Sequence, residues 1–564
     1  MTHKLAIAAL AAGSLAWSQP AQNWTHKVRI GGHSLRLDRV DEIVRSATET
    51  NVYGIETDND ITGRYESFLD PAEKLKAIRA VAEKAHAAGN KAFVYIAGLE
   101  CITANADRAP HSFFKDHPDW VQRKLTGEPA VFGGGTAFWI AKGDEDVWIS
   151  PYAAEWRKIY MQRVREIAGT GIDGIYVDIP YWMTHFDGWE DSWASFDDYT
   201  VAAFKARTGL DAKKDIKPGD FNDPGFRRWI DFRIDTLTEF MREIDANVKA
   251  VNRECMTIAE IYPGIEEEAV RVGSDVYDMY RVVDVIAHEY EYGGGHHTAA
   301  SKTQDDWFHY MTGMLTFRAF AEGKASWMLS YSWDGEKNVD RKDAMKNLFA
   351  AQLTAGTNPW DARGHVMSGS NDMATRKAIF GWIRDHEKTF YTPRTPIDPV
   401  GVYFSPSTRN YHPREFTDAY RAAMERLMQA HIETQVVTPR TLGAFRGRFL
   451  IVPDAGVLAN ENLDAYKGKL LTGAQIPGGW RGAVEVKASP GVATQIARVN
   501  GRTHVFLVNF LGRKTDAAFS FESGSKAFAL DYLGETRELE TKREGGRLTC
   551  ALPQLDKAAV VWVE

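Results

Sequence analysis

The most constraining feature of the sequence is a long alternation between two kinds of segment, from about residue 25 to residue 385. Short runs rich in β-branched and aromatic residues are each followed by a longer amphipathic stretch, as in βα units around a parallel sheet. We expect eight strands, at 27–31, 52–57, 92–97, 173–178, 256–261, 283–288, 326–331 and 353–358. Helices are expected at 70–88, 152–168, 224–250, 301–322 and 341–352. The pattern predicts a (β/α)8 TIM barrel, a fold whose active sites lie at the C-terminal ends of the strands.

The remaining segments predict three further parts of the chain. Residues 1–18 combine a lysine, a short apolar run and small residues at the end, which is the pattern of a secretory signal peptide. The barrel is expected over 25–390. Three β runs with a helical stretch among them predict a small α/β domain at 396–475, and β runs between Gly- and Lys-rich turns predict a C-terminal β-sandwich at 484–564.

Charge and cysteine content exclude several classes of partner. The net charge is −8, and the absence of a long basic run argues against nucleic acid. The apolar run near the N-terminus is too short to span a bilayer, so we expect no membrane association. Three widely separated cysteines predict neither a disulfide framework nor a metal site. We therefore expect a periplasmic or secreted protein without a cofactor.

Two carboxylates end neighbouring predicted strands. In "GIDGIYVDIPYW", alternation places Gly174, Tyr176 and Asp178 on the face that points into the barrel. In "MTIAEIYPG" the same reasoning places Glu260 inward at the end of the next strand. Glycoside hydrolysis needs such a pair, one carboxylate as nucleophile or base and the other as acid. Asp178 and Glu260 are therefore the candidate catalytic residues.

The sixth predicted strand, followed by "EYEYGGGHH", contributes two further candidates. Alternation places His288 inward, where it would bind a sugar hydroxyl or the nucleophile. Glu289 lies at the exit of the strand and is an alternative to Glu260 as the acid. His296 and His297 have no acid at a metal-ligand spacing, so we expect no metal.

The remaining candidates are groups that would hold a sugar rather than cleave it. Glu56 and Asp58 end the second strand, where inward acids bind hydroxyl groups. Aromatic residues at strand ends or in the following loops are candidate stacking platforms, here Tyr181, Trp182 and Trp327. An oligosaccharide or a glycoconjugate is the expected substrate.

The stretches "AVAEKAHAAGNKAFVYIAG", "HPDWVQRKLTGEPA", "GIDGIYVDIPYW" and "FKARTG" resemble secreted (β/α)8 glycoside hydrolases related to α-L-fucosidases and family-42 β-galactosidases. The resemblance implies that the segment after the barrel is flavodoxin-like and helps to form a homo-oligomer. Family-42 enzymes place a glutamate acid on the fourth strand and a glutamate nucleophile on the seventh, whereas this chain has Asp178 and "SWMLSYSWDG" there. An aspartate on the fourth strand is similar to the nucleophile of α-fucosidases and of amylase-type barrels, and the amylase type places a glutamate acid on the fifth.

The positions of the two carboxylates thus favour a retaining hydrolase of an α-linked sugar, with Asp178 as nucleophile and Glu260 as acid/base. Two alternatives remain open. One is an inverting glycosidase that uses Asp178 or Glu260 as base, with Glu289 or His288 taking part; the other is a non-catalytic glycan-binding barrel protein. The separation of the two carboxylates distinguishes retention, at about 5 Å, from inversion, at roughly 6.5–9.5 Å.

Overall fold

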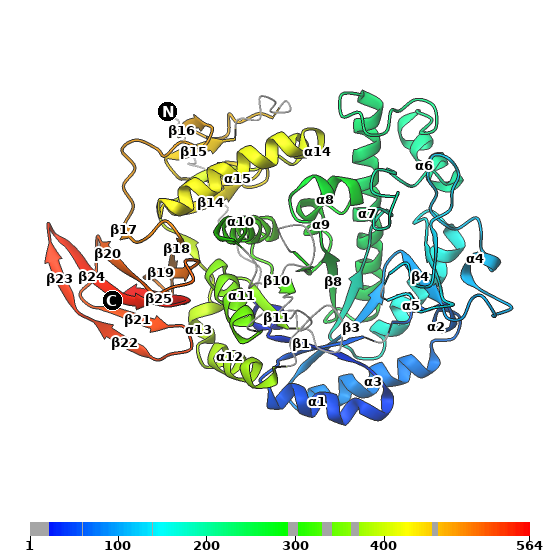
Figure 1. The fold of residues 1–564 in the computed structure, drawn as a ribbon, viewed down its shortest axis with the longest axis horizontal. Helices are drawn as coiled ribbons and strands as arrows, with labels where there is room; N and C mark the ends of the chain where they lie inside the picture. The colour runs from blue at the N-terminus through cyan, green and yellow to red at the C-terminus, as the bar shows by residue number, and fades with distance from the viewer. Residues whose placement is uncertain are drawn as a thin grey trace, which may run out of the picture.

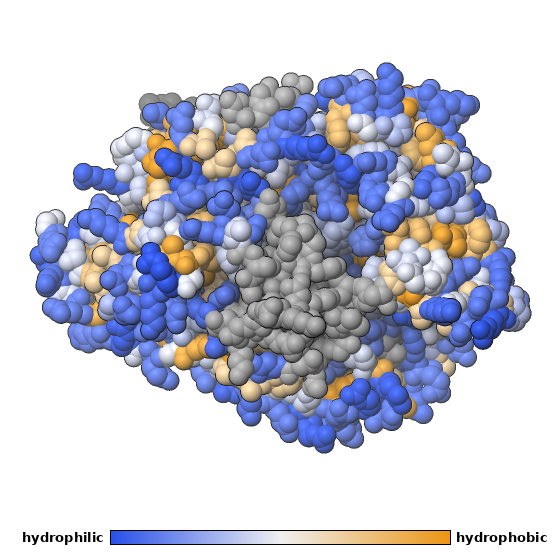
Figure 2. All heavy atoms as spheres, in the orientation of Figure 1, coloured by the Kyte–Doolittle hydropathy of each residue, from blue (hydrophilic) through white to orange (hydrophobic). Residues whose placement is uncertain are grey.

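The structure is a computed structural model that describes residues 22–58, 60–137, 139–290, 303–329, 341–361, 372–453 and 461–564. The expected signal peptide at 1–18 and the pair His296 and His297 lie outside these residues. Figure 1 shows a barrel with its helical layer, a small sheet with two helices beside it, and an all-β part that contains the C-terminus. No described helix is long and apolar enough to cross a membrane. The coloured surface in Figure 2 is largely hydrophilic, with small separate apolar patches.

The first part is a closed barrel of eight parallel strands in the order β1-β11-β10-β9-β8-β7-β3-β2. These strands are β1 (Ile30–Ser34), β2 (Gly54–Asp58), β3 (Lys91–Ala97), β7 (Gly174–Asp178), β8 (Met256–Ile261), β9 (Val285–His288), β10 (Ser326–Leu329) and β11 (Asn358–Asp361). The larger surrounding helices are α1 (Val40–Glu49), α3 (Ala72–Ala87), α5 (Ala154–Ala168), α7 (Pro224–Val251), α10 (Gln304–Ala321), α11 (Arg341–Ala355) and α12 (Met373–Asp385). The predicted barrel is confirmed.

The eighth strand was misplaced by the sequence pattern. Residues 353–355, predicted as strand, form the last turn of α11, and the strand follows at Asn358–Asp361. Leu353 continues the buried face of α11, and Gly356, at φ +82°, ends the helix. Pro359 lies within the true strand, where proline normally argues against a strand, and this hid the element from pattern reasoning.

A long excursion between β3 and β7 covers one side of the barrel's C-terminal end. It contains the small sheet β4-β6-β5, formed by β4 (Glu100–Thr103), β5 (Val131–Gly133) and β6 (Glu145–Trp148). Four short helices lie in this and neighbouring connections, namely α2 (Tyr65–Leu69), α4 (Phe113–Asp116), α8 (Glu267–Val272) and α9 (Val276–Met279). The helix α6 (Asp198–Thr208) follows β7 after a loop. These connections supply side chains to the candidate site.

The second part is a four-stranded parallel sheet of order β14-β13-β15-β16. Its elements are β13 (Val400–Tyr403), α14 (Pro406–Tyr411), α15 (Pro413–Gln429), β14 (Thr434–Val437), β15 (Phe449–Val452) and β16 (Lys469–Thr472). This order is flavodoxin-like, as expected. A buried ion pair of 2.6 Å between Arg409 of α14 and Asp275 joins this sheet to the barrel connections.

The third part is a β-sandwich, also as expected. One sheet has the order β12-β18-β19-β25-β21-β22 and the other β17-β20-β24-β23. The strands are β12 (Thr395–Pro396), β17 (Val484–Lys487), β18 (Val492–Val499), β19 (Arg502–Asn509), β20 (Thr515–Phe521), β21 (Ala527–Asp531), β22 (Thr536–Leu539), β23 (Thr541–Glu544), β24 (Arg547–Leu555) and β25 (Ala558–Val563). The inner faces of the two sheets share one apolar cluster.

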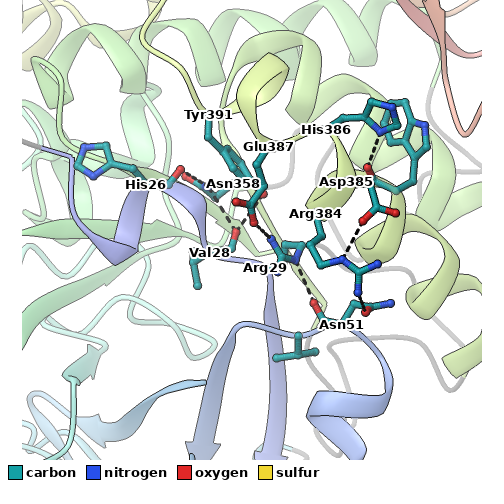
Figure 3. Close-up of polar contacts among 12 residues, drawn as sticks. His26, Val28, Arg29, Asn51, Asn358, Arg384, Asp385, His386, Glu387 and Tyr391 are labelled. Atoms are coloured by element: carbon teal, nitrogen blue, oxygen red, sulfur yellow. Dashed lines mark hydrogen bonds and ion pairs between the residues drawn. The ribbon is translucent and has the colours of Figure 1, made fainter. Parts of the chain in front are cut away.

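The N-terminal end of the barrel is closed by the segment before β1 and by the helix α13 (Glu387–Phe390) (Figure 3). Asn358 donates a hydrogen bond of 3.0 Å to the His26 carbonyl, and Tyr391 donates one of 3.3 Å to that of Val28. Arg29 and Glu387 form an ion pair of 2.6 Å. The rings of Trp24 and Trp327 lie 5.7 Å apart, tilted against each other, inside the barrel. The interior of the barrel is therefore a packed core, and active sites of this fold lie at its other end.

Candidate active site

Asp178 lies at the C-terminal end of β7 on the inward face. The residues of matching parity, Gly174 and Tyr176, face the barrel axis, whereas Ile175 and Val177 pack into the outer core beneath the helices. Gly174 is required here because a Cβ would lie 2.9 Å from Ile258 Cδ1 and 3.0 Å from Phe93 Cβ. Asp178 itself is partly exposed.

Glu260 lies at the same level on the neighbouring strand β8 and is 1% exposed. Its Oε2 accepts a hydrogen bond of 2.5 Å from the Tyr181 hydroxyl and a long one of 3.5 Å from the Ile179 amide. The Tyr181 hydroxyl in turn accepts a hydrogen bond of 2.8 Å from the Tyr262 amide. No described residue donates to Oε1 of Glu260, although this atom is buried. In a protonated Glu260, this oxygen can carry the proton and donate it to a substrate.

Glu289 completes a cluster of three carboxyls. Ala287 pairs with Glu260 and faces the barrel interior. Glu289 comes two residues after Ala287, so it also points inward, one layer of side chains above Glu260. The Glu260 carboxyl is in hydrogen-bonding contact with the carboxyls of Asp178 and Glu289. Burial, followed by the charges of Asp178 and Glu289, raises the pKa of Glu260 well above its ordinary value. These effects favour the protonated form of Glu260, which is the form that a general acid needs.

Glu56 and Asp58 extend the acidic cluster along β2. Both have inward parity, and Glu56 is 8% exposed whereas Asp58 is exposed at the strand end. Burial raises the pKa of Glu56 well above its usual value, and the charges of Asp58 and Asp178 add to this shift. The structure thus brings Glu56 and Asp58 to the same end of the barrel as Asp178.

Sequence reasoning missed Tyr95. It lies on β3, where it pairs with Tyr176, and its hydroxyl hydrogen-bonds the Asp178 carboxyl. Burial and the charge of Asp178 raise the pKa of this tyrosine well above its ordinary value, so the hydroxyl stays protonated and donates. Inward parity on the third strand is the pattern that identifies it.

A second buried carboxyl pair, Glu100 and Asp146, lies on the small sheet next to this cluster. The two side chains hydrogen-bond each other, and Trp139 Nε1 donates to Glu100 Oε1 at 3.1 Å. Burial raises the pKa of both, that of Asp146 to about 7. His185 lies nearby with an exposed ring, 6.5 Å from Trp139 and 5.1 Å from Tyr262. No local sequence pattern marks His185, because loops far apart in the chain create its surroundings.

His288 is a correction to the sequence analysis. It points outward from β9, away from the carboxyl cluster, because Val285 and Ala287 occupy the inward positions of this strand. Its ring stacks on Phe317 of α10 at 4.0 Å, and its Nε2 hydrogen-bonds the Tyr280 hydroxyl at 2.9 Å. His288 is therefore part of the packing between the barrel and its helices.

Trp182 and Trp327 are also corrections, since both side chains are fully buried and offer no ring face to a sugar. Trp182 lies in the outer core and donates a hydrogen bond of 3.0 Å to the Arg233 carbonyl. Trp327 fills the barrel interior and donates one of 2.9 Å to the Thr25 carbonyl. Both have the ordinary role of large aromatic residues. Tyr181 is 1% exposed and is therefore not a stacking platform either, but its hydroxyl contacts Glu260 directly.

Together, the three parts define a (β/α)8 barrel with a flavodoxin-like sheet and a β-sandwich, and solved structures of this kind are similar to the chain. A GH42 β-galactosidase from G. stearothermophilus matches with a TM-score of 0.66 and 10% identity, covering 96% of this chain and 98% of that one. The β-galactosidase from Bacillus circulans sp. alkalophilus matches with a TM-score of 0.64 and 11% identity, over 95% and 99% of the two chains.

A cycloisomaltooligosaccharide glucanotransferase from Paenibacillus sp., complexed with cycloisomaltoheptaose, matches with a TM-score of 0.53 and 8% identity, over 96% and 85% of the two chains. No protein-family model and no curated protein sequence matches the chain. At these low identities the similarity establishes the shared fold.

Proposed function

We propose that this protein is a glycoside hydrolase that cleaves an α-linked sugar with retention of configuration, with Asp178 as nucleophile and Glu260 as acid/base. The observation that carries the proposal is the contact between the Glu260 and Asp178 carboxyls at adjacent strand ends inside the barrel. Active sites of this fold lie at that end. The GH42 neighbours, whose names state that they are β-galactosidases, support the reaction class.

The raised pKa of Glu260 suits the role of the acid. Glu260, whose pKa is raised, donates its proton to the leaving oxygen while Asp178 attacks the anomeric carbon. Breaking the glycosidic bond leaves a sugar covalently bound to Asp178. Glu260 then takes a proton from water, which attacks the same carbon and releases Asp178. Tyr95 holds the nucleophile, and Tyr181 holds the acid/base.

The contact between the two carboxyls favours retention over inversion. An inverting enzyme keeps its carboxyls roughly 6.5–9.5 Å apart to accommodate a water molecule, whereas a retaining pair is separated by about 5 Å. Glu260 and Asp178 lie at the same level on adjacent strands and their carboxyls interact directly, which favours the shorter separation. The inverting alternative would need Glu289 to take part, because His288 points away from the cluster.

The α linkage is proposed from the strands that carry the pair. An aspartate on the fourth barrel strand and a glutamate on the fifth resemble the amylase type rather than the family-42 pattern. The glucanotransferase neighbour supports this choice, because cycloisomaltoheptaose is a ring of α-linked glucose units. The second candidate is a β-galactoside, which the names of the GH42 neighbours favour.

Several finer points belong to the same proposal. The substrate is an oligosaccharide or glycoconjugate, the protein is periplasmic or secreted after removal of residues 1–18, and the flavodoxin-like part contributes to a homo-oligomer. N-terminal sequencing of the mature protein and light scattering test the last two points. A glycan-binding protein without activity is disfavoured, since binding alone does not require a buried carboxyl of raised pKa beside a second carboxyl.

The test is a screen of aryl α- and β-glycosides, including glucosides, galactosides and fucosides, followed by proton NMR of the first-formed sugar. We expect hydrolysis of an α-glycoside and an α-configured first product. A β product from an α substrate would establish inversion, activity on β-galactosides alone would select the second candidate, and binding without hydrolysis would leave only the glycan-binding role.

A further inference from the structure

A cavity of about 210 Å³ lies at the opposite end of the barrel from the carboxyl cluster. It is bounded by the loops that precede β10 and β11, by the N-terminal segment and by residues 390–394. Figure 3 shows part of this region, where His26, Asn358 and Tyr391 lie around Val28. A cavity of this size holds a small molecule together with several waters.

The charge of the cavity wall is strongly one-sided. Three cationic side chains line it, Arg318, Lys324 and Arg394, and none of its described lining residues is acidic. The two guanidinium carbons both lie within 3.2 Å of the point that a Cβ on Gly356 would occupy, so the two like charges are close neighbours. No described carboxylate forms an ion pair with either arginine. Charged side chains that are taken out of water normally have a counter-ion.

Carbonyl groups satisfy part of the hydrogen-bonding capacity of these cations. Lys324 donates to the Tyr280 and Val283 carbonyls at 2.5 and 2.7 Å. The Arg394 guanidinium lies over the Phe506 ring. Arg318 donates to the Ala355 carbonyl at 2.5 Å, and Arg394 donates to the Thr354 and Leu353 carbonyls at 2.6 Å each. Arg394 is 8% exposed, and its buried Nε has no partner among the described residues. Each guanidinium has five N–H donors, so most of them are not used by these contacts.

The acid whose charge acts on both arginines is Glu433. Burial raises the pKa of Glu433 to about 8, while the two arginines act to lower it. Glu433 accepts a hydrogen bond from the Ile496 amide. No hydrogen bond or ion pair among the described residues joins it to the buried Arg394 or the half-buried Arg318.

We propose that this cavity binds a small tetrahedral oxyanion, phosphate or sulfate, between Arg318, Arg394 and Lys324. Guanidinium groups match the geometry of such oxyanions with paired N–H donors. The bound ion would supply the missing charge beside the last turn of α11, whose carbonyls already hold both arginines. The site is separate from the proposed reaction and does not depend on it.

The test is calorimetric titration of the full chain with inorganic phosphate and with sulfate, in a neutral amine buffer at constant ionic strength. We expect one oxyanion per chain and a thermal midpoint raised by a few degrees. Arg318→Gln keeps an amide donor for the Ala355 carbonyl but loses the charge, and should weaken binding at least about tenfold. Gln22→Glu adds a negative charge at the exposed rim of the cavity and should also weaken it.

The matched control is Arg513→Gln, which removes an exposed arginine from a sandwich turn and should leave binding unchanged. If Arg318→Gln does not fold, Gln22→Glu decides alone. The proposal is overturned if wild-type protein shows no saturable binding. It is also overturned if binding is the same in wild type and in every folded cavity variant, because the ion would then be adventitious and bound elsewhere.

Discussion

The hydroxyl of Tyr181 donates a hydrogen bond of 2.5 Å to Oε2 of Glu260, and both side chains are about 1% exposed. Tyr181 follows β7, the strand that carries Asp178, whereas Glu260 belongs to β8. The loop that continues from the proposed nucleophile therefore also positions the proposed acid/base. The contact leaves Oε1 as the oxygen that can carry and transfer the proton.

Tyr181→Phe should lower kcat about tenfold and move the alkaline limb of the kcat/KM profile to higher pH. The ionised form of Glu260 loses a donor in this variant, which raises the pKa of the carboxyl further. The matched control is Tyr280→Phe, which removes the hydroxyl that bonds His288 in the outer core. An alkaline limb that moves equally in both variants would contradict a specific role for Tyr181.

Asp178→Asn should reduce turnover by at least about 10³-fold, because the covalent step loses its nucleophile. The thermal midpoint should stay nearly unchanged, since Asp178 is partly exposed and the amide has the same shape. Asp58→Asn, at the exposed end of β2, is the control and should mainly raise KM. An Asp178→Asn enzyme that keeps a tenth of wild-type activity would rule out the assignment.

Glu260→Gln should slow glycosides with poor leaving groups by about 10²–10⁴-fold and activated aryl glycosides far less, because only the former need a proton. The comparison is Glu289→Gln on the same two substrates. If the loss that depends on the leaving group occurs in Glu289→Gln instead, Glu289 is the acid and Glu260 serves to position it.

His185→Ala should raise KM by about tenfold while leaving the free energy of unfolding within about 0.5 kcal/mol of wild type, since the ring is exposed. Trp182→Ala should do the reverse, because a fully buried indole is removed from the outer core, at a cost of about 3–5 kcal/mol. The measurements are steady-state kinetics and urea unfolding. Normal stability with a raised KM in Trp182→Ala would show that its burial had been misjudged.

Asp146→Asn should gain stability relative to wild type as the pH rises from 5 to 8. Burial raises the pKa of Asp146 to about 7, so the folded state binds this proton more tightly than the unfolded state does. Its stabilising contribution is therefore complete below about pH 4 and is lost as the pH rises through 7. Asparagine stays neutral, and the relative gain should approach about 3 kcal/mol.

The measurement for this prediction is denaturant unfolding at both pH values. Asp187→Asn, which replaces an exposed carboxylate in a nearby loop, is the control and should show no comparable pH-dependent gain. A stability difference between Asp146→Asn and wild type that does not depend on pH would mean that Asp146 is ionised in the folded protein.

Local sequence determined the barrel, the two parts that follow it, and the inward direction of Asp178 and Glu260. Strand periodicity and turn residues encode these features within a few neighbouring positions. Only the tertiary structure decided that His288 faces outward. Its strand, β9, is short, and the register of β9 with β8 and β10 decides which of its side chains point into the barrel. Trp182 and Trp327 look like site aromatics in sequence, and only packing shows that they are core. His185 and the pair of Glu100 and Asp146 approach Asp178 through folding of distant segments, and no local pattern can encode a meeting of that kind.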